Sequence, residues 1–328
     1  MDSAFFAGLI GHGELKKRLA HLLSSDRMPH AAVFAGPAGL GKSAFARAVA
    51  SAMVGRSVLQ TWDEAGGAMI RDGADVFCLA PVGKGLKVEQ FRQLQEALIL
   101  QGDSGSKRVC VIRHAETMNA EFSNRMLKTL EEPPAGVYFI LLTDQPDLLL
   151  ATIRSRCTVF SFQPIAAADL LDGLARCCGG SREQYAEAVR WSGGNLQAAL
   201  DFLSGRGTKG VTAALQFLQI LATHPSPYAK WLTLVAAVDE AEMKVFIRVL
   251  MAVLRDLAVL RAGLPQSALC LQGCFDELVQ LLPYWDDAAV FTLLRVLEES
   301  WEAMTRNVNG SLIRDHICLG FLQAKGGV

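Results

Sequence analysis

The stretch GPAGLGKS, residues 36–43, decides how the amino-terminal half of this chain is interpreted. It follows the apolar run AAVFA and fits the pattern G-x-x-x-x-G-K-[ST] through Gly36, Gly41, Lys42 and Ser43. In such a loop the glycines let backbone N–H groups and the positive end of the next helix face phosphate oxygens. The motif predicts a nucleotide-binding loop in which Lys42 reaches the β- and γ-phosphates and Ser43 coordinates Mg²⁺. Gly39, inside the loop, is counted with these phosphate-binding residues.

Two other interpretations of this loop stay open. The glycines can serve only a tight turn that joins a strand to a helix. Alternatively, the loop is an inherited cradle that still folds but is seldom occupied by a nucleotide.

Short apolar runs alternate with helical patterns on either side of the loop. The runs are near-continuous rather than alternating, which is typical of parallel strands covered on both faces. The segments between them are long enough for crossover helices. The predicted strands are 31–35, 74–80, 108–112, 137–142 and 158–162. This pattern predicts a doubly wound α/β domain.

One intervening segment, AETMNAEFSNRMLKTLEEPP, has the apolar spacing of an amphipathic helix. Met118, Phe122, Met126 and Leu130 recur every four residues. The helix is expected to end before the two prolines that follow, because proline cannot continue it.

Strand patterns stop after Phe162, and the remaining chain is helical. A small helical unit with the turn SGGN (192–195) is followed by SGRGTKG (204–210), which predicts a linker. The last segment is broken at HPSP, AGLPQS and LPYWDD and resembles a bundle of buried helices. The predicted domains are 1–163 (α/β core), 164–207 (helical lid) and 208–328 (all-α oligomerisation domain).

The acidic residues expected downstream of a phosphate-binding loop are missing from the sequence. In P-loop NTPases a strand next to the loop strand ends in a residue that holds Mg²⁺. The candidate strand here, RVCVI, ends at Arg113 and His114. A guanidinium cannot coordinate a cation, and Glu116 lies two or three residues too far along to be a simple replacement. We therefore expect nucleotide binding with weak or absent hydrolysis.

Composition bounds the possible functions. The 328 residues carry a formal net charge of -1, so any nucleic-acid surface must be a local patch. The sequence shows neither a signal peptide nor an apolar run long enough to span a bilayer, and its eight cysteines are scattered without paired zinc spacing. These features predict a cytoplasmic protein with no metal site formed by the chain itself.

Several motifs together resemble the bacterial clamp-loader branch of the AAA+ ATPases, through much of residues 8–205. LIGHGELKKRLAHLLSSDRMPHAAVFAGPAGLGKS is similar to the family's opening, and NRMLKTLEEPP to a helix end specific to clamp loaders. TIRSRC matches the Ser-Arg-Cys motif, which implies that Arg156 acts as an arginine finger on ATP held by an adjacent subunit. Thr143 falls at the sensor-1 position. SGGNLQAAL resembles the sensor-2 segment, with Gln197 where motor subunits present an arginine.

Departures from the family pattern indicate which type of clamp-loader subunit the chain resembles. The four-cysteine zinc module that follows the P-loop helix is absent, because residues 53–72 contain no cysteine, so no zinc is expected. Arg113 and His114 replace the acidic pair, and Gln197 replaces the sensor-2 arginine. These changes imply the stationary delta-prime type of subunit rather than a tau/gamma motor.

The resemblance implies a non-hydrolysing subunit of the DNA polymerase III clamp loader, and so a component of a DNA-directed DNA polymerase holoenzyme. Its implied partners are delta and tau/gamma subunits, the sliding clamp, and primer–template DNA reached through the assembled complex; no membrane is implied. ATP or ADP, with Mg²⁺, is the implied cofactor. The alternatives are an active ATPase, either tau/gamma-like or another P-loop enzyme, and a scaffold that neither binds ATP nor donates a finger.

Overall fold

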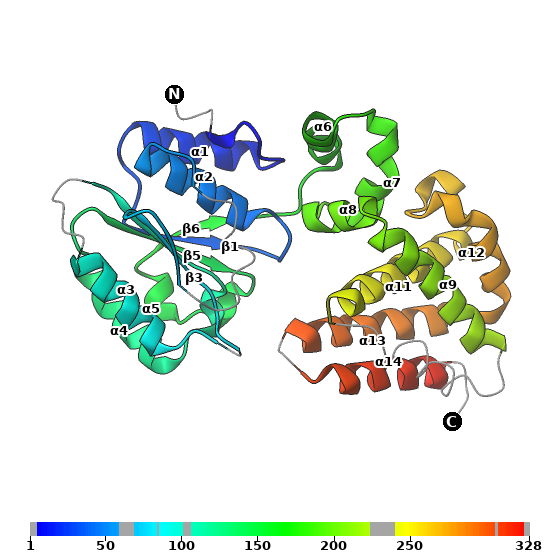
Figure 1. The fold of residues 1–328 in the computed structure, drawn as a ribbon. Coiled ribbons are helices and arrows are strands. Elements are labelled where there is room, and N and C mark those ends of the chain that lie inside the picture. The colour runs from blue at the N-terminus through cyan, green and yellow to red at the C-terminus, as the bar shows by residue number, and fades with distance from the viewer. Residues whose placement is uncertain are drawn as a thin grey trace. The chain divides into compact units, whose positions relative to one another are not determined.

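The computed structural model describes residues 5–58, 69–83, 85–100, 106–223, 240–305 and 308–324. The chain divides into two compact units, Met1–Cys178 and Gly179–Val328 (Figure 1). The predicted break at HPSP (224–227) lies outside the described residues, as does part of the 53–72 segment. The separate helical lid at 164–207 stays a prediction.

The amino-terminal unit is built on a six-stranded sheet with the order β2-β3-β4-β5-β1-β6. All neighbouring strands are parallel except β2, which pairs antiparallel with β3 at the edge. The strands are β1 (Ala31–Ala35), β2 (Ile70–Asp72), β3 (Val76–Leu79), β4 (Arg108–Ile112), β5 (Val137–Thr143) and β6 (Thr158–Ser161). The five predicted strands and the α/β class are confirmed.

The strand order corrects one expectation about the phosphate-binding loop. The strand RVCVI, which is β4, is not next to the loop strand β1, because β5 lies between them. The register pairs Ala35 of β1 with Thr143 of β5, so it is the end of β5 that lies beside the start of the loop.

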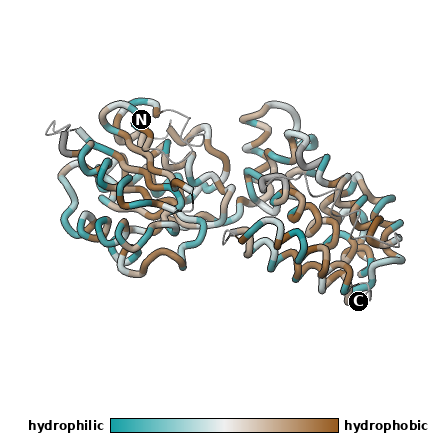
Figure 2. The backbone as a smooth tube through the Cα atoms, turned by 60° about the horizontal axis from the view of Figure 1, so that its bottom comes forward, coloured by the Kyte–Doolittle hydropathy of each residue, from teal (hydrophilic) through white to brown (hydrophobic). Residues whose placement is uncertain are grey.

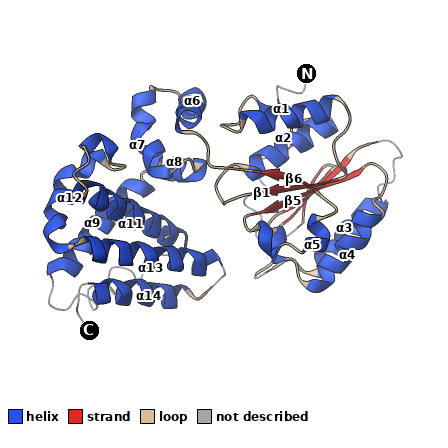
Figure 3. Ribbon diagram, turned by 180° about the vertical axis from the view of Figure 1, so that it is seen from behind, coloured by secondary structure: helices blue, strands red, loops and turns tan. Residues whose placement is uncertain are grey.

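Helices cover both faces of the sheet, as Figure 3 shows. Two helices, α1 (Gly13–Ser24) and α2 (Lys42–Val54), lie on one face. On the other face lie α3 (Val88–Leu100), α4 (Ala120–Glu131) and α5 (Ala151–Arg154). Alternate strand residues point to opposite faces, so the two layers have separate apolar cores. Phe34 and Phe45 pack in the core beneath α2, and Phe91 and Phe122 in the core beneath α3 and α4.

The LKTLEEPP helix is α4, and it forms for the reasons its sequence predicts. Phe122, Met126 and Leu130 are buried on one face. The side chain of Asn119 caps the helix by accepting a hydrogen bond of 2.8 Å from the backbone N–H of Phe122. The helix ends at Glu131, before the two prolines.

The carboxy-terminal unit is helical in all its described elements, and hydrophobic and hydrophilic residues alternate along them (Figure 2). Its core includes the fully buried side chains of Trp285 and Phe217. The helices are α7 (Arg182–Ser192), α8 (Leu196–Leu203), α9 (Arg206–Thr223), α11 (Glu240–Arg261), α12 (Phe275–Leu281), α13 (Asp287–Thr305) and α14 (Gly310–Ala324). One further helix, α6 (Ala167–Cys178), closes the amino-terminal unit. The predicted breaks at AGLPQS and LPYWDD are confirmed.

The predicted linker at 204–210 is wrong for most of its length, because α9 begins at Arg206. Gly210 lies inside that helix, where an added Cβ would approach a methyl group of Val249 on α11 to 3.2 Å. The glycine therefore serves close helix packing rather than chain flexibility. Among the described helices, none is both long and apolar enough to cross a bilayer.

Candidate nucleotide site

The phosphate-binding loop begins at a backbone position that only glycine fits. Gly36 has a φ of 147°, and an added Cβ would lie 2.3 Å from the carbonyl oxygen of Phe162. Its N–H donates to the carbonyl of Thr143 at 3.2 Å, so the loop starts between the ends of β5 and β6. Gly39 and Gly41 also have positive φ angles, of 82° and 90°. The sequence prediction of a strand–loop–helix cradle is met in its backbone geometry.

Lys42, the first residue of α2, is only 7% exposed and has several partners. Its Nζ donates to the carbonyl oxygens of Gly36 at 2.5 Å and Pro37 at 2.7 Å. It also forms an ion pair of 2.7 Å with Oδ1 of Asp144. A phosphate group binding here would compete with Asp144 for this ammonium group. Ser43 is the second residue of α2 and so lies at the same helix end.

The three side chains of His114, Glu116 and Asp144 meet next to Lys42. Nδ1 of His114 lies 3.4 Å from Oε1 of Glu116 and 3.8 Å from Oδ2 of Asp144. One ligand-type atom from each residue falls within 4.8 Å of the others. The structure therefore places two carboxylates and an imidazole beside the lysine of the phosphate loop.

Glu116, two or three residues beyond the position expected for the metal-binding acid, nevertheless lies in this cluster. A 3₁₀ turn at Ala115–Thr117 directly after β4 folds the chain back. His114 enters that turn with a positive φ of 49°. Burial raises the pKa of Glu116, but hydrogen bonds involving His114, Thr143 and its own backbone N–H outweigh it, and the net pKa is lowered. Glu116 is thus held as a carboxylate.

Thr143, predicted at the sensor-1 position, ends β5 and is 1% exposed. Its side-chain oxygen accepts a hydrogen bond from the N–H of Gln145. Together with its contact to Glu116, this position joins the end of the strand to the cluster. Gln197 lies on α8 in the other unit, where it donates to Asp201 at 3.2 Å, and its sensor-2 role stays a prediction.

His12 contacts the backbone of the phosphate loop. Its Nε2 lies 3.0 Å from the carbonyl oxygen of Leu40, and its ring packs edge-on against Phe45 and Phe162. Burial lowers the pKa of His12, and the hydrogen bond to Leu40 offsets only part of that effect. The neutral imidazole, with Nε2–H as donor to the carbonyl, is the form that this environment favours.

Arg156 does not join this cluster. It precedes Thr158, which pairs with Ala32, whereas Gly36 lies four residues beyond Ala32 on a parallel strand. At a rise of ~3.3 Å per residue, roughly 13 Å of strand separates the two ends. Arg156 therefore lies at the amino-terminal ends of the strands, whereas the phosphate loop lies at their carboxy-terminal ends.

The Arg156 side chain is 38% exposed and is oriented by two contacts. Its Nη2 forms an ion pair of 2.6 Å with Oε1 of Glu131, the first glutamate of LKTLEEPP. Its Nη1 donates to the carbonyl of Thr152 at 3.1 Å. The two motifs that carried the sequence resemblance, TIRSRC and LKTLEEPP, thus meet in one surface contact.

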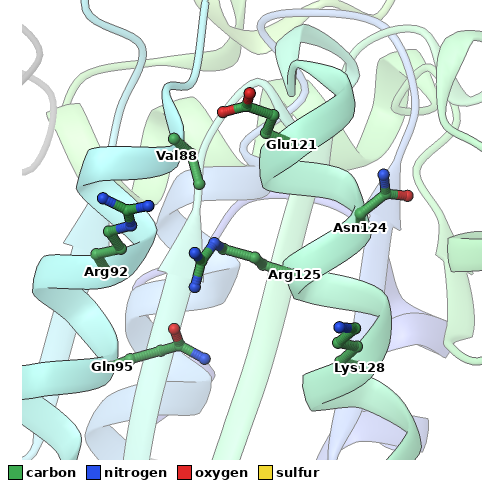
Figure 4. Close-up of a pocket in the computed structure, with 7 residues that line it drawn as sticks. All are labelled: Val88, Arg92, Gln95, Glu121, Asn124, Arg125 and Lys128. Carbon is green, nitrogen blue, oxygen red and sulfur yellow. The ribbon is translucent and has the colours of Figure 1, made fainter.

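A basic groove runs between α3 and α4 (Figure 4). It has a volume of about 470 Å³ and contains three cationic side chains and one acidic one. Arg125 reaches from α4 toward α3, where Arg92 lies. The lining residues are Val88, Arg92, Gln95, Glu121, Asn124, Arg125 and Lys128. This groove is a local positive patch on a chain of near-neutral net charge.

Sequence reasoning missed Asp144 and this groove. Asp144 directly follows Thr143 at the carboxyl end of a strand adjacent to the loop strand, which was a usable signal once the strand order was known. The groove joins two helices that are distant in sequence, so only the packing of α3 on α4 brings its cations together.

The loop strand lies between β5 and β6 in a largely parallel sheet, and a Gly-Lys-Ser cradle stands at the start of α2. The second unit is helical. These features define the AAA+ P-loop fold. Residues 11–166 match the family model described as DNA polymerase III, delta subunit. This part of the chain is therefore similar to that family, and the relatives below include delta-prime subunits.

Individual relatives show the same similarity. The delta-prime subunit of Bacillus subtilis is 32% identical over 196 residues, covering 55% of this chain and 60% of that protein. A gamma/tau subunit of Mycoplasma pneumoniae is 28% identical over 164 residues, covering 49% of this chain and 24% of that protein. The matched segment thus spans less than two thirds of either relative.

A solved structure shows the same fold. The DNA polymerase III gamma subunit-related protein of Thermotoga maritima covers 93% of this chain and 99% of its own, with a TM-score of 0.52 and 13% sequence identity. At this identity the likeness is evidence for the fold alone.

Proposed function

We propose that this chain is a delta-prime-like, cytoplasmic subunit of a DNA polymerase III clamp loader. It does not hydrolyse ATP itself but places Arg156 against ATP bound to a neighbouring tau/gamma subunit. In the assembled ring, which also contains a delta subunit, it helps to load the sliding clamp onto primed DNA. The match of residues 11–166 to the family model supports the class of complex.

The observation that carries the finger role is the separation of Arg156 from the chain's own phosphate loop. The two lie at opposite ends of neighbouring parallel strands, so this guanidinium cannot contact a phosphate bound at Lys42 of the same chain. A partly exposed arginine at that end is suited to a phosphate presented by another subunit.

The contacts of Arg156 orient its side chain but are weak enough to be exchanged for a phosphate. An exposed ion pair such as that with Glu131 is worth only about 0.2–1 kcal/mol. A γ-phosphate with developing negative charge offers a stronger bidentate partner. The pair with Glu131 therefore orients the finger and releases it at low cost.

The loop itself is proposed to hold ATP or ADP, with Mg²⁺, through Gly36, Gly39, Gly41, Lys42 and Ser43, with Thr143 nearby. The backbone cradle at the start of α2 supports binding. The arginine directly after β4 and the engagement of Lys42 by Asp144 support slow or absent turnover.

A second candidate function is an active ATPase of the tau/gamma kind. It is favoured by Glu116 and Asp144, which place carboxylates near the loop where the sequence predicted none. Steady-state ATP turnover by the purified chain separates the two. We expect turnover at background level that Lys42→Ala does not change; appreciable turnover that Lys42→Ala abolishes would establish the motor instead.

Primer–template DNA is proposed to contact the groove between α3 and α4 within the assembled complex. Arginine and lysine side chains bind backbone phosphates without reading sequence. Arg92, Arg125 and Lys128 supply such groups on one face.

The helical unit is proposed to hold the ring together. It presents large apolar side chains to the surface, among them Phe291 on α13 at 65% exposure and Leu312 on α14 at 61% exposure. Exposed apolar residues on neighbouring helices are typical of a subunit contact.

Omission of this chain from a reconstituted loader tests the proposed function. Delta, tau/gamma, the clamp and primed DNA are combined with and without the chain, and the rate of clamp loading is measured. We expect loading to require the chain. Equal loading in its absence, with the chain folded and present in the other sample, would refute the role.

A further inference from the structure

The side chains of His114, Glu116 and Asp144 are brought together by the sheet itself. β4 and β5 are parallel neighbours, with Ile112 paired to Leu141, so the residues that follow each strand emerge at the same edge. The 3₁₀ turn after β4 then returns Glu116 toward Asp144. Rigid elements, rather than a long loop, fix the positions of all three.

The separations between these groups suit coordination of one ion. A tetrahedral ion with bonds of about 2.0–2.1 Å has ligand atoms roughly 3.3 Å apart. The imidazole Nδ1 lies 3.4 Å from the nearer oxygen of Glu116 and 3.8 Å from that of Asp144. The two carboxylate oxygens lie within 4.8 Å of each other, and rotation of these side chains can bring them closer around a cation.

Glu116 supplies a second, independent observation at this cluster. Its side chain is 8% exposed, and its Oε2 is buried without a hydrogen-bond partner among the residues that the structure describes. A buried carboxylate oxygen without a partner costs free energy unless a donor or a metal satisfies it. Glu116 is also one of the residues that line a hollow of about 200 Å³, to which His114 and Asp144 do not contribute.

We propose that His114, Glu116 and Asp144 bind one divalent cation of the Zn²⁺/Mn²⁺ class beside the phosphate loop. Two carboxylates and a neutral imidazole form a ligand set with open positions for water, and the imidazole favours these ions over Mg²⁺. The sequence predicted no metal ligands, because only the strand order and the 3₁₀ turn bring Asp144 and Glu116 close to His114.

This site is distinct from the metal expected at a P-loop, which Ser43 and a carboxylate would hold together with the nucleotide. It is formed by the chain without a nucleotide and does not depend on the clamp-loader role. Because Nζ of Lys42 lies 2.7 Å from Asp144, its positive charge opposes a cation there.

Mn²⁺ binding to the full-length, nucleotide-free chain, followed by the EPR signal of free Mn²⁺, tests the proposal. Mn²⁺ is the probe because it avoids the cysteine thiols that would capture Zn²⁺. We expect one ion per chain and an affinity loss of at least ~10-fold in Glu116→Gln. Asp147→Asn, which alters a carboxylate that is 96% exposed, should bind as the parent does.

Two further variants make the result decisive. Lys42→Ala should retain or tighten Mn²⁺ binding, because it removes a neighbouring positive charge. His114→Asn changes a side chain that is 45% exposed, so it should fold and still lose at least ~10-fold in affinity even where Glu116→Gln does not fold. Absence of binding, unchanged binding in the foldable ligand variants, or binding that appears only with ATP and is lost in Lys42→Ala would each overturn the site.

Discussion

Gly36 is the single residue on which the geometry of the cradle most depends. Its φ of 147° and the 2.3 Å approach of a hypothetical Cβ to the Phe162 carbonyl exclude any side chain without movement of the backbone. The sequence motif predicted a glycine here because phosphate must approach closely. The structure adds that the glycine is also needed for the junction between β1 and β6.

Gly36→Ala should therefore destabilise the folded chain even without nucleotide. Strained backbone of this kind costs about 1–3 kcal/mol, and the clash adds to it. The matched control is Gly55→Ala, at a positive φ of 71° but with open space around the added Cβ, for which we expect only about 1–2 kcal/mol. Denaturant unfolding measures both; equal losses would mean that the contact with Phe162 is unimportant.

His12 makes the stability of the amino-terminal unit depend on pH. Its pKa is lowered in the folded state, chiefly by burial, and is ~6.5 when unfolded. Between these values the unfolded chain binds the extra proton, so the unfolding free energy falls as the pH drops below ~6.5 and is unaffected above it.

Hydrogen exchange of the β1 amides at pH 7 and pH 5.5, converted to opening free energies, measures this effect. His12→Gln keeps a donor for the Leu40 carbonyl but cannot titrate. We expect the parent to lose more stability than the variant on acidification. The same loss in both proteins would assign the pH dependence to other groups.

Residue-level prediction from sequence succeeded where a motif fixes the backbone and failed where contacts cross between strands. The glycine loop and the start of α2 at Lys42 form as the motif predicts. The proximity of Asp144 and Glu116 was not predicted, because it depends on the position of β5 in the strand order and on the 3₁₀ turn at Ala115–Thr117. Neither feature has a local signature.

At the scale of elements, α4 shows how a helix can be predicted almost to its ends. Phe122, Met126 and Leu130 of the predicted spacing form its buried face, whereas Met118 lies before the helix; Asn119 and the prolines mark its limits. Strand β2 was missed because IRD is short and only partly buried at the sheet edge. The misassigned linker shows the limit of composition, since a Gly-rich stretch packs as the start of α9.

Asn119→Ala should destabilise α4 by about 1 kcal/mol, since its side chain caps the helix. Asn124→Ala, at an exposed position inside the same helix, is the control and should be neutral or slightly stabilising. Thermal unfolding of the two variants checks this. A loss in Asn124→Ala as large as that in Asn119→Ala would argue against the cap.

At the scale of the whole molecule, the sequence predicted the α/β core and an all-helical remainder, and both are confirmed. It could not predict the division into compact units at Cys178–Gly179, because α6 closes the first unit through contacts that are distant in sequence. One example is the packing of Gly173 against Ile10. The positions of the phosphate loop and of Arg156 at opposite ends of neighbouring strands support the proposed role in trans.

The central claim, that Arg156 serves a neighbour's ATP, is tested most directly by the ATPase rate of a reconstituted loader. Arg156→Ala is compared with Arg154→Ala, which alters another exposed arginine two residues earlier that pairs with Asp147. Assembly is checked by size-exclusion chromatography. An arginine finger is worth ~10³–10⁵ in rate, so Arg156→Ala should silence the site it completes and lower total turnover by that site's share, while Arg154→Ala should match the parent. Unchanged turnover in a fully assembled Arg156→Ala complex would contradict the account.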